Sequence, residues 1–573
     1  MIGSWRPAGK LARRNRTCLI LTGVAIAVMV TRIVLTYRVF NDTADEPYHI
    51  GSAVAMIESG RHIRGTQHPP LTRLITGAAL KLAGVEHPSD RNVREIQLDL
   101  TAFEVGHEVL LRSTPGYWKV LTVARISTLI FPIAAVFYVY LIGRYVAGAL
   151  PGCLAAICFS TDPTLLAHGG LVTTDVAAAA GFLAATYHGV KFIARPDWKR
   201  SLIAGIALGL ALSCKFSCIA VIPGLVLIAL LRRRRALFEG PVHRYFKSWP
   251  RISRVATVLL TAFVTLWATF LFDFGRIQAS PALQKGAEWY SIPNWLKSTP
   301  IPMPAIVPGF MMVVQHNRAG HSTYINGSLE AFGTVSYFPE AIILKTPAAV
   351  LVGLVLAIGS AILARRLPPM LGITLFPFAV YMLISMNAKL NLGIRHVLPA
   401  IPFLYLLLMQ QLALVRMNLF AMIVTALAFI ETLCLHPDYL AFFNVFAGGP
   451  RSGEKYLLDS NLDWGQDQFR LAKWLEQNAK GRIVTDRVFG NPRLREWQHE
   501  GYTILPPGSV PRGLLAVSKN EAYGLYLGVW DDADGKRHVE APLFGLERYK
   551  RVARIGYTID VYDLDASVGA PSR

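Results

Sequence analysis

The chain has 573 residues, of which 53% are hydrophobic and only 17% are charged. Soluble domains average about 45–50% apolar and about 25% charged residues. This composition therefore excludes a disordered chain, a collagen, a coiled coil and an ordinary cytosolic enzyme. The apolar residues come in blocks close to the length that crosses a bilayer, and these blocks predict a polytopic all-α membrane protein.

The 58 lysines and arginines outnumber the 37 aspartates and glutamates, which gives a net charge of +21. In a soluble protein this balance would suggest nucleic acid, but here the cations gather between apolar runs. Arg232–Arg235 directly follow one run, and Lys247, Arg251 and Arg254 precede the next. Such clusters are typical of the cytoplasmic loops of membrane proteins. We therefore expect contacts with membrane lipids and no nucleic-acid partner.

The apolar runs predict about 11 membrane helices, judged by a span length near 20 residues. The first run follows a basic N-terminus and ends without a small-residue cleavage site, which indicates a membrane helix rather than a removed signal peptide. The predicted spans are Cys18–Tyr37, Lys119–Tyr140, Val146–Leu165, Leu171–Ile193, Leu202–Leu212, Phe216–Leu231, Val255–Phe272, Ala341–Leu363, Leu371–Met386, Ile394–Leu414 and Leu419–Leu435.

A cytoplasmic N-terminus makes every inside loop basic, as the positive-inside rule requires. The cations concerned are Arg144, Arg195, Lys199, Arg200, the 232–254 cluster, Arg365, Arg366 and Arg416. An odd number of spans then places the outer loops 41–118 and 273–340 on the extracytoplasmic side, together with the tail. We expect a transmembrane domain over residues 1–436 and an extracytoplasmic α/β domain over residues 437–573.

The first outer loop is expected to hold helices that lie in the membrane interface. Thr43–Ser59 reads as a helix with Thr43 as its N-cap and acidic residues in its first turn. After His68-Pro69-Pro70, apolar residues from Leu71 to Leu82 follow helical spacing. In the tail, the pattern predicts a helix over Gln466–Asn478. The predicted strands of the tail are Arg482–Val488, Gly513–Val517 and Ile555–Tyr562.

Three acidic residues at outer helix ends are the candidates for catalysis. Asp45 and Glu46 lie just past the first span, where acids are unnecessary for topology. Adjacent helical residues point in different directions, so if one carboxylate is a base, the other positions something. Asp175 lies at the outer end of a span, and an ionisable residue at membrane depth is a candidate site residue. A purely structural role at a helix N-terminus remains open for all three.

Cations at the outer edge would suit a phosphate carried by a lipid, because Arg and Lys neutralise charge on a leaving phosphate. Each one alone could instead be an interfacial side chain that reaches for the headgroups. His68 could equally belong to a rigid turn that begins an interfacial helix. The substrate-binding candidates are His68, Arg73, Arg125, Lys215, Lys345, Arg395 and His396.

Asp459, Asp463 and Asp467 have the spacing of a calcium-loop start, but the rest of that motif is missing. Gly465 stands in the seventh place instead of the sixth, and Arg470 replaces the bidentate glutamate. The cysteines lie in or beside apolar runs, which indicates packing rather than a zinc site or disulfides. No cofactor is assigned, and a divalent metal at the site stays open.

A series of short motifs resembles the lipid-carrier-dependent glycosyltransferases of the C-type membrane fold, close to protein O-mannosyltransferases and aminoarabinose transferases. The motifs are Asp45-Glu46, His68-Pro69-Pro70-Leu71, Leu171-Val172-Thr173-Thr174-Asp175, Gly209–Phe216, Tyr337–Glu340 with Lys345-Thr346-Pro347, Gly393-Ile394-Arg395-His396 and Asp459–Asp467. Their order and their spread over nearly the whole chain are specific for the family, but not for a sugar or an acceptor.

The resemblance implies transfer of a sugar from a polyprenyl-phosphate sugar to a lipid, glycan or protein acceptor. It implies an active site on the extracytoplasmic face, in a bacterial inner membrane. Asp45 stands where the family keeps its essential aspartate, which implies that Asp45 is the general base. Direct attack by the acceptor is a single displacement, so the anomeric centre would invert. The tail departs from the trefoil insert of eukaryotic protein mannosyltransferases.

Two other classes of protein are alternatives to a transferase. A multi-span transporter would place its site near the bilayer midplane and often shows inverted repeats, whereas the candidate residues here lie at outer helix ends. A non-catalytic lipid-binding protein would keep the fold and lose Asp45, which this chain retains. The sugar, the acceptor, the carrier length and the oligomeric state do not follow from the sequence.

Overall fold

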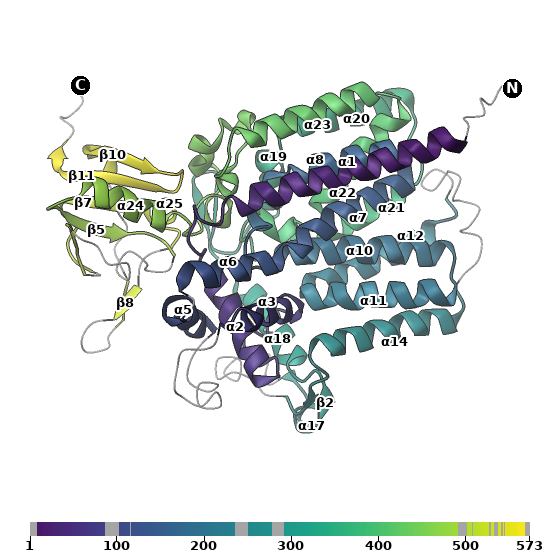
Figure 1. Cartoon of the computed structure of the whole chain (residues 1–573), viewed down its shortest axis with the longest axis horizontal. Helices are drawn as coiled ribbons and strands as arrows, with labels where there is room; N and C mark the ends of the chain where they lie inside the picture. Colours follow the sequence, from purple (N-terminus) through teal and green to yellow (C-terminus); the bar gives the residue numbers. More distant parts are fainter. Residues whose placement is uncertain are drawn as a thin grey trace.

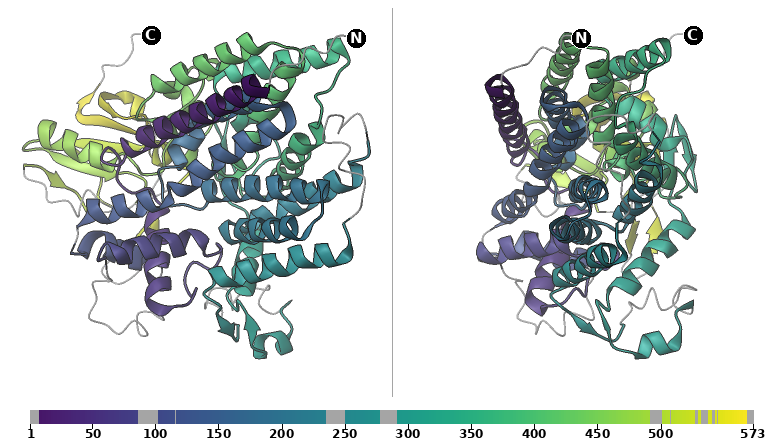
Figure 2. Two further views of the ribbon diagram at one scale, coloured as in Figure 1. Left: turned by 45° about the vertical axis from the view of Figure 1, so that its right-hand side comes forward. Right: turned by 90° about the vertical axis from the view of Figure 1, so that its right-hand side faces the viewer.

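The computed structural model describes residues 8–85, 102–114, 116–234, 250–277, 291–490, 501–506, 508–526, 529–531, 537–539, 543 and 545–567. Long helices lie side by side, and a small sheet lies at one end of them (Figure 1). Helix α1 begins at the end far from the sheet, and the helices of the first outer loop gather near the sheet end, as the turned views also show (Figure 2). Segments far apart in the sequence therefore meet at the end where the tail lies.

The main helices follow the apolar runs of the sequence. They are α1 (Ala8–Val34), α6 (Tyr117–Thr128), α7 (Ile130–Ala147), α8 (Ala149–Ser160), α9 (Pro163–His168), α10 (Asp175–Ala194), α11 (Trp198–Cys214), α12 (Val221–Leu231), α14 (Ile252–Thr269), α19 (Tyr337–Lys345), α20 (Ala348–Ala364), α21 (Leu371–Met386), α22 (Ile401–Leu414) and α23 (Asn418–Leu433). One apolar core of buried residues joins α1, α7, α8, α10 and α22.

Four spans of helix in the described residues are long and apolar enough to cross a membrane, or five if one bent pair counts as a span. The shorter apolar helices of 10–17 residues are Ala149–Ser160, Phe216–Leu231, Leu371–Met386, Ile401–Leu414 and Asn418–Leu433. The prediction of a mostly helical membrane protein is therefore confirmed. The predicted number of about 11 full-length spans is not.

Prolines explain why two of the predicted spans are broken. The predicted span Val146–Leu165 is divided into α8 and α9, where Pro163 has no N–H and Asp162 caps the new helix by accepting from Leu165 N at 3.0 Å. The predicted span Ala341–Leu363 is divided at Pro347, and α19 and α20 meet there at 113°. A proline therefore ends a helix even within a run of mostly apolar residues.

In the first outer loop the described helices are α2 (Glu46–Ser59), α3 (Leu71–Leu82) and α5 (Ala102–Arg112). The predicted N-cap Thr43 is wrong, because α2 begins at Glu46 and Asp45 occupies the N-cap position. Thr43 instead donates its backbone N–H to the Glu46 carboxylate at 2.9 Å. Glycines allow α2 and α5 to pack closely, since a Cβ on Gly106 would collide with the Pro47 carbonyl.

The middle outer loop, over its described residues, consists of short elements. They are β1 (Phe274–Gly275), α17 (Asn294–Ser298), β2 (Ile301–Pro302), α18 (Ile306–Ala319), β3 (Thr323–Ile325) and β4 (Ser328–Glu330). Strands β1 and β2 pair antiparallel, as do β3 and β4. Parts of the loops predicted at 41–118 and 273–340, and of the basic cluster at 232–254, lie outside the described residues.

Single-turn helices lead from α23 to the tail sheet and pack on the membrane helices. They are η4 (Tyr439–Ala441), η5 (Val445–Ala447), η6 (Pro450–Lys455) and η7 (Asp459–Asn461), and two more of this kind are η1 (Phe216–Ala220) and η3 (Ile394–Val397). Tyr439, Phe443 and Leu458 are buried in the same core as the membrane helices. The start of the tail is therefore part of the helical body.

The tail holds a mixed sheet of strand order β10-β11-β7-β5-β6. Its elements are α24 (Gln468–Asn478), β5 (Ile483–Arg487), β6 (Thr503–Ile504), β7 (Leu514–Ser518), α25 (Lys519–Ala522), η8 (Leu546–Arg548), β10 (Tyr549–Ile555) and β11 (Ile559–Ser567), with a separate pair β8 (Val529–Asp531) and β9 (Arg537–Val539). Strands β5 and β7 are parallel, and β11 is antiparallel to β7. Leu471, Leu475 and Val484 form the core between α24 and the sheet.

The tail predictions agree with the structure except at its last strand. Helix α24 and strands β5 and β7 lie within two residues of the predicted bounds. The predicted strand Ile555–Tyr562 is wrong, because Ile555 ends β10 and Ile559 begins β11. Gly556 turns the chain there with φ of +55°. A glycine at a tight turn thus interrupts a pattern of alternating apolar residues.

Candidate active site

Two of the predicted site carboxylates lie against the guanidinium of Arg395. Its Nη1 lies 2.9 Å from Asp45 Oδ2 and 3.5 Å from Asp175 Oδ2. Lys215 Nζ donates to Asp175 Oδ1 at 2.7 Å. We call Asp45, Asp175, Lys215 and Arg395 the outer cluster. Burial alone would lower the pKa of Arg395, but the carboxylates of Asp45 and Asp175 outweigh it and hold that pKa above its usual value.

Each member of the outer cluster stands at the end of a helix. Asp45 precedes α2, Asp175 begins α10, Lys215 follows α11 and Arg395 lies in η3. Asp45 and Arg395 are 350 residues apart in the sequence. Gly393, with φ of +99°, brings the turn before Arg395 against Ser460, where a Cβ would collide with the hydroxyl. The geometry of the site therefore depends on the packing of four separate segments.

The motif Asp459–Asp467 supports Arg395 from the tail side. The Trp464 ring lies 4.1 Å from the Arg395 guanidinium carbon, and Arg395 Nε donates to Ser460 Oγ at 3.1 Å. Ala44 N donates to Trp464 O at 3.0 Å, which ties the same turn to the residue before Asp45. The sequence pattern predicts only a capped turn at Asp459-Ser460-Asn461 and no contact of Ser460 or Trp464 with Arg395, although both lie in a motif of the resembled family. A tryptophan face suits a guanidinium through cation–π attraction.

The three acidic candidates differ sharply in exposure. The side chain of Asp45 is 33% exposed, that of Asp175 is 2% exposed and that of Glu46 is fully buried. Asp175 has both carboxylate oxygens in contact with cations, Lys215 on one and Arg395 on the other. Asp45 alone combines a position in the cluster with a surface that an incoming molecule can reach.

Glu46 has different surroundings from those expected of a group that orients an acceptor or an ion. Its Oε1 accepts from Arg125 Nε at 2.9 Å and from Val172 N at 3.1 Å. Its Oε2 accepts from Arg125 Nη2 at 2.7 Å and from Thr43 N at 2.9 Å. Arg125 also donates to the carbonyls of Phe40 and Asn41. This buried pair joins the chain before α2 to α6 and to the motif that ends in Asp175.

His68 and Arg73 lie beside the cluster, on the side of α2 and α3. Arg73 Nη1 donates to His68 O at 2.6 Å, and the His68 ring faces Thr174 Oγ1 at 3.4 Å. His49, which the sequence analysis did not select, has its ring 5.2 Å from that of His68. It follows Asp45 by four residues, which is the spacing that could have identified it. Burial and then the Arg73 charge hold the pKa of His49 well below its usual value, so it is neutral.

His396 and Lys345 complete the predicted substrate-binding set. His396 accepts at its backbone oxygen from the Tyr381 hydroxyl, and burial together with Lys215 holds the pKa of its ring well below the usual value. Lys345 Nζ donates to Leu440 O at 2.8 Å and to Asn461 O at 2.5 Å. Lys345 therefore contacts the segment that follows α23. Its two hydrogen bonds link α19 to the start of the tail.

We predict that Lys345→Met destabilises the protein without weakening its affinity for a donor. The substitution leaves the carbonyls of Leu440 and Asn461 without their donor, and hydrogen bonds to charged groups are worth about 1.5–3 kcal/mol. Thermal melting in detergent and titration of donor saturation measure the two effects separately. A normal melting temperature with lost donor saturation would instead place Lys345 at the phosphate.

We predict that stability falls as pH rises through the range where Asp463 titrates. Burial raises the pKa of Asp463 to about 7, above about 3.9 for an unfolded chain. Between these values the folded chain binds more protons than the unfolded chain, so the free energy of unfolding decreases with rising pH. Urea unfolding of wild type and Asp463→Asn between pH 4 and about 8 checks this. If the free energy of unfolding changed equally with pH in wild type and in Asp463→Asn, the prediction would be contradicted.

The described residues contain no group of three or more His, Cys, Asp or Glu side chains placed to hold a metal ion. The outer cluster pairs its carboxylates with Lys215 and Arg395 instead.

Residues 118–267 match the model of the family described as dolichyl-phosphate-mannose-protein mannosyltransferase. This segment includes Arg125, Asp175 and Lys215, whereas Asp45 and Arg395 lie outside it. No curated protein matches the chain.

Several solved structures of membrane transferases are similar to the chain at low sequence identity. ArnT from Cupriavidus metallidurans bound to undecaprenyl phosphate is 12% identical, with a TM-score of 0.45, and the match covers 96% of this chain and 99% of ArnT. The archaeal oligosaccharyltransferase AglB from Archaeoglobus fulgidus is 13% identical, with a TM-score of 0.46 and coverage of 92% and 74%. The Pmt1-Pmt2 complex of S. cerevisiae is 17% identical, with a TM-score of 0.34 and coverage of 46% and 35%.

The family model and the apolar helices agree that the chain is an integral membrane protein. The match of residues 118–267 agrees with the resemblance of the motifs Leu171–Asp175 and Gly209–Phe216, which lie within this segment, to lipid-carrier-dependent glycosyltransferases of the C-type membrane fold.

Proposed function

We propose that this chain is a membrane glycosyltransferase that moves a sugar from a polyprenyl-phosphate sugar to an acceptor hydroxyl, with inversion. The observation that carries the proposal is the reachable carboxylate of Asp45 beside the cations Arg395 and Lys215. The match of residues 118–267 to a mannosyltransferase family supports the reaction class. The acceptor in this proposal is a lipid, a glycan or a protein.

Asp45 is the general base in this proposal. It takes the proton of the acceptor hydroxyl while the oxygen forms a bond to the anomeric carbon of the sugar. The bond from that carbon to the phosphate oxygen breaks, and its electron pair leaves with the polyprenyl phosphate. Asp175 is too enclosed for this task, because Lys215 and Arg395 hold both of its oxygens.

Arg395 and Lys215 bind the donor phosphate in this proposal, and Asp175 positions them. Arg395 Nη1 donates to Asp45 Oδ2 at 2.9 Å. An incoming phosphate competes for this guanidinium, because phosphate is a good bidentate partner for arginine. Binding of the donor therefore loosens the ion pair and frees the Asp45 carboxylate to accept the proton of the acceptor hydroxyl. The neutral rings of His49 and His68 lie 5.2 Å apart and within electrostatic reach of Asp175, and they can hydrogen-bond to a sugar.

The site lies on the extracytoplasmic face of a bacterial inner membrane in this proposal. We predict a cytoplasmic N-terminus and an external C-terminus, because the basic loops would then lie inside. A reporter that is active only in the cytoplasm should stay silent when fused after Arg573. Strong cytoplasmic activity of that fusion would place the outer cluster on the opposite face.

The proposed activity is tested with the purified full chain in detergent and a panel of polyprenyl-phosphate sugars. We expect release of polyprenyl phosphate from one donor class, in an amount equal to the sugar transferred, and only when a lipid, glycan or protein acceptor is present. Failure to release lipid phosphate from any donor, together with sugar transport into proteoliposomes, would favour a transporter.

A further inference from the structure

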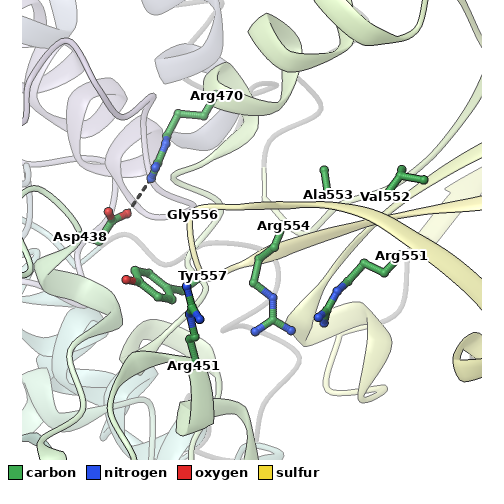
Figure 3. A pocket seen from close by; sticks show the side chains of 9 residues that line it. All are labelled: Asp438, Arg451, Arg470, Arg551, Val552, Ala553, Arg554, Gly556 and Tyr557. Carbon is green, nitrogen blue, oxygen red and sulfur yellow. Dashed lines mark hydrogen bonds and ion pairs between the residues drawn. The ribbon is translucent and has the colours of Figure 1, made fainter.

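A basic pocket lies between the tail sheet and the segment that follows α23, apart from the outer cluster. The pocket has a volume of about 540 Å³ and is lined by Arg451, Arg470, Arg551, Arg554, Asp438 and Tyr557, among others. Figure 3 shows the guanidinium groups of Arg451, Arg554 and Arg551 on the same side of the β10–β11 hairpin. Four arginines and one acidic residue line this space, so we call it the arginine pocket.

Two of the arginines are fixed by carboxylates. Arg470 Nη1 lies 2.6 Å from Asp438 and 3.0 Å from Asp467. Arg554 Nε lies 2.7 Å from Asp560. The first pair joins α24 to the segment that follows α23, the second joins the two strands of the hairpin, and both hold a guanidinium group in place. A binding site whose charged groups are already ordered loses little conformational entropy when a ligand arrives.

The other two arginines carry charge that their surroundings do not neutralise. Arg551 lies 3.6 Å from Asp560, but that carboxylate is already bound by Arg554 and by Lys519, and the Arg551 side chain is 49% exposed. Arg451 is exposed and has no ion pair within the part of the chain that the structure describes. The mouth of the pocket is therefore positively charged, and it would attract an anion.

We propose that the arginine pocket binds a phosphate ester, as carried by the headgroup of a membrane lipid. Guanidinium groups bind phosphate oxygens in pairs, and a pocket of this size has room for a phosphate with a small polar substituent. Asp438 follows the end of the apolar helix α23 at Leu433 by five residues. Five residues span at most about 18 Å, which keeps the pocket within reach of the headgroup layer.

This site is independent of the proposed sugar transfer. It shares none of its lining residues with the outer cluster. A phosphate ester could come from a membrane phospholipid or from a soluble molecule, and both present the same anion to the pocket. The test therefore uses a lipid and a soluble probe, and it measures binding rather than turnover.

The test compares two double variants of the full chain that change the net charge equally. R451Q/R551Q removes the two arginines at the mouth, whereas R548Q/K550Q removes two exposed cations of the same hairpin region that do not line the pocket. Both variants leave Arg470 and Arg554 in their ion pairs. Size-exclusion elution and melting without ligand establish that each variant is folded, and the single variant R451Q serves as a milder change.

The probes are inorganic phosphate, and micelles of neutral detergent that contain phosphatidylglycerol or phosphatidylcholine. We expect ligand to raise the melting temperature of wild type and of R548Q/K550Q. The half-saturating concentration should rise by about tenfold or more in R451Q/R551Q, because one charged hydrogen bond accounts for about that factor. A response to phosphatidylglycerol alone would identify a lipid headgroup, and a response to inorganic phosphate alone would identify a soluble ester. Equal responses in both double variants, or no response in wild type, would overturn the proposal.

Discussion

Asp45→Asn should lower the rate of transfer by about 10²–10⁴-fold, which is the usual loss when a general base is removed. This corresponds to about 3–5 kcal/mol of activation free energy. The substitution keeps the shape of the side chain and its contact with Arg395 Nη1, but removes the charge that accepts the proton. Single-turnover measurement of sugar transfer at saturating donor checks this.

The stability of Asp45→Asn should change little. Asp45 makes no side-chain capping bond to α2, its side chain is 33% exposed, and ion pairs that solvent reaches are worth about 0–1 kcal/mol. Asp45→Glu is the matched control, because it keeps the basic group one methylene further out. We expect it to retain more activity than Asp45→Asn. A fully active Asp45→Asn next to an inactive, folded Asp175→Asn would assign the base to the other carboxylate.

Glu46→Gln should destabilise the protein by about 3–5 kcal/mol, the range found when one partner of a buried ion pair is removed. The Arg125 side chain is 1% exposed, and the substitution leaves its charge without a carboxylate. An amide also presents its NH₂ group to donors at Arg125, Val172 or Thr43, which cannot accept it. Activity should be lost together with folded protein, since this pair holds the chain that carries Asp45.

Two controls distinguish a loss of stability in Glu46→Gln from a direct role of Glu46 in the reaction. Glu58→Gln, at the exposed end of the same helix, should change stability by less than about 0.5 kcal/mol. The double variant E46L/R125M should be more stable than either single variant, because apolar replacement of both partners leaves no buried charge. Denaturant unfolding of wild type, Glu46→Gln, Glu58→Gln, E46L, R125M and E46L/R125M in detergent measures this. A stable but inactive Glu46→Gln would mean that Glu46 takes part in the reaction itself.

The contrast between Asp45 and Glu46 shows where sequence reasoning ends. Adjacent helical residues must differ in direction, and that much followed from spacing alone. Which carboxylate is buried depends on Arg125, which lies 79 residues away in the chain. The same holds for Arg395, whose partners Asp45 and Trp464 come from distant segments. Motif order suggested that these residues act together, but only packing brings them into contact.

The apolar helices were easier to predict than their interruptions. Hydropathy over a window of bilayer length locates a helix because every lipid-facing position must be apolar. Pro163 and Pro347 break helices inside such windows, and Gly556 breaks a strand pattern. These effects act through single backbone positions, so the average over a window does not register them. The arginine pocket was also missed, because its members come from η6, α24 and β10.

The anomeric configuration of the transferred sugar is the most direct test of the proposed mechanism. NMR of the product, made by the wild-type chain from a polyprenyl-phosphate sugar of known configuration, measures it. A single displacement assisted by Asp45 predicts complete inversion at the anomeric carbon. Retention of configuration would require two displacements and a covalent intermediate, and would contradict the role of Asp45 as a general base.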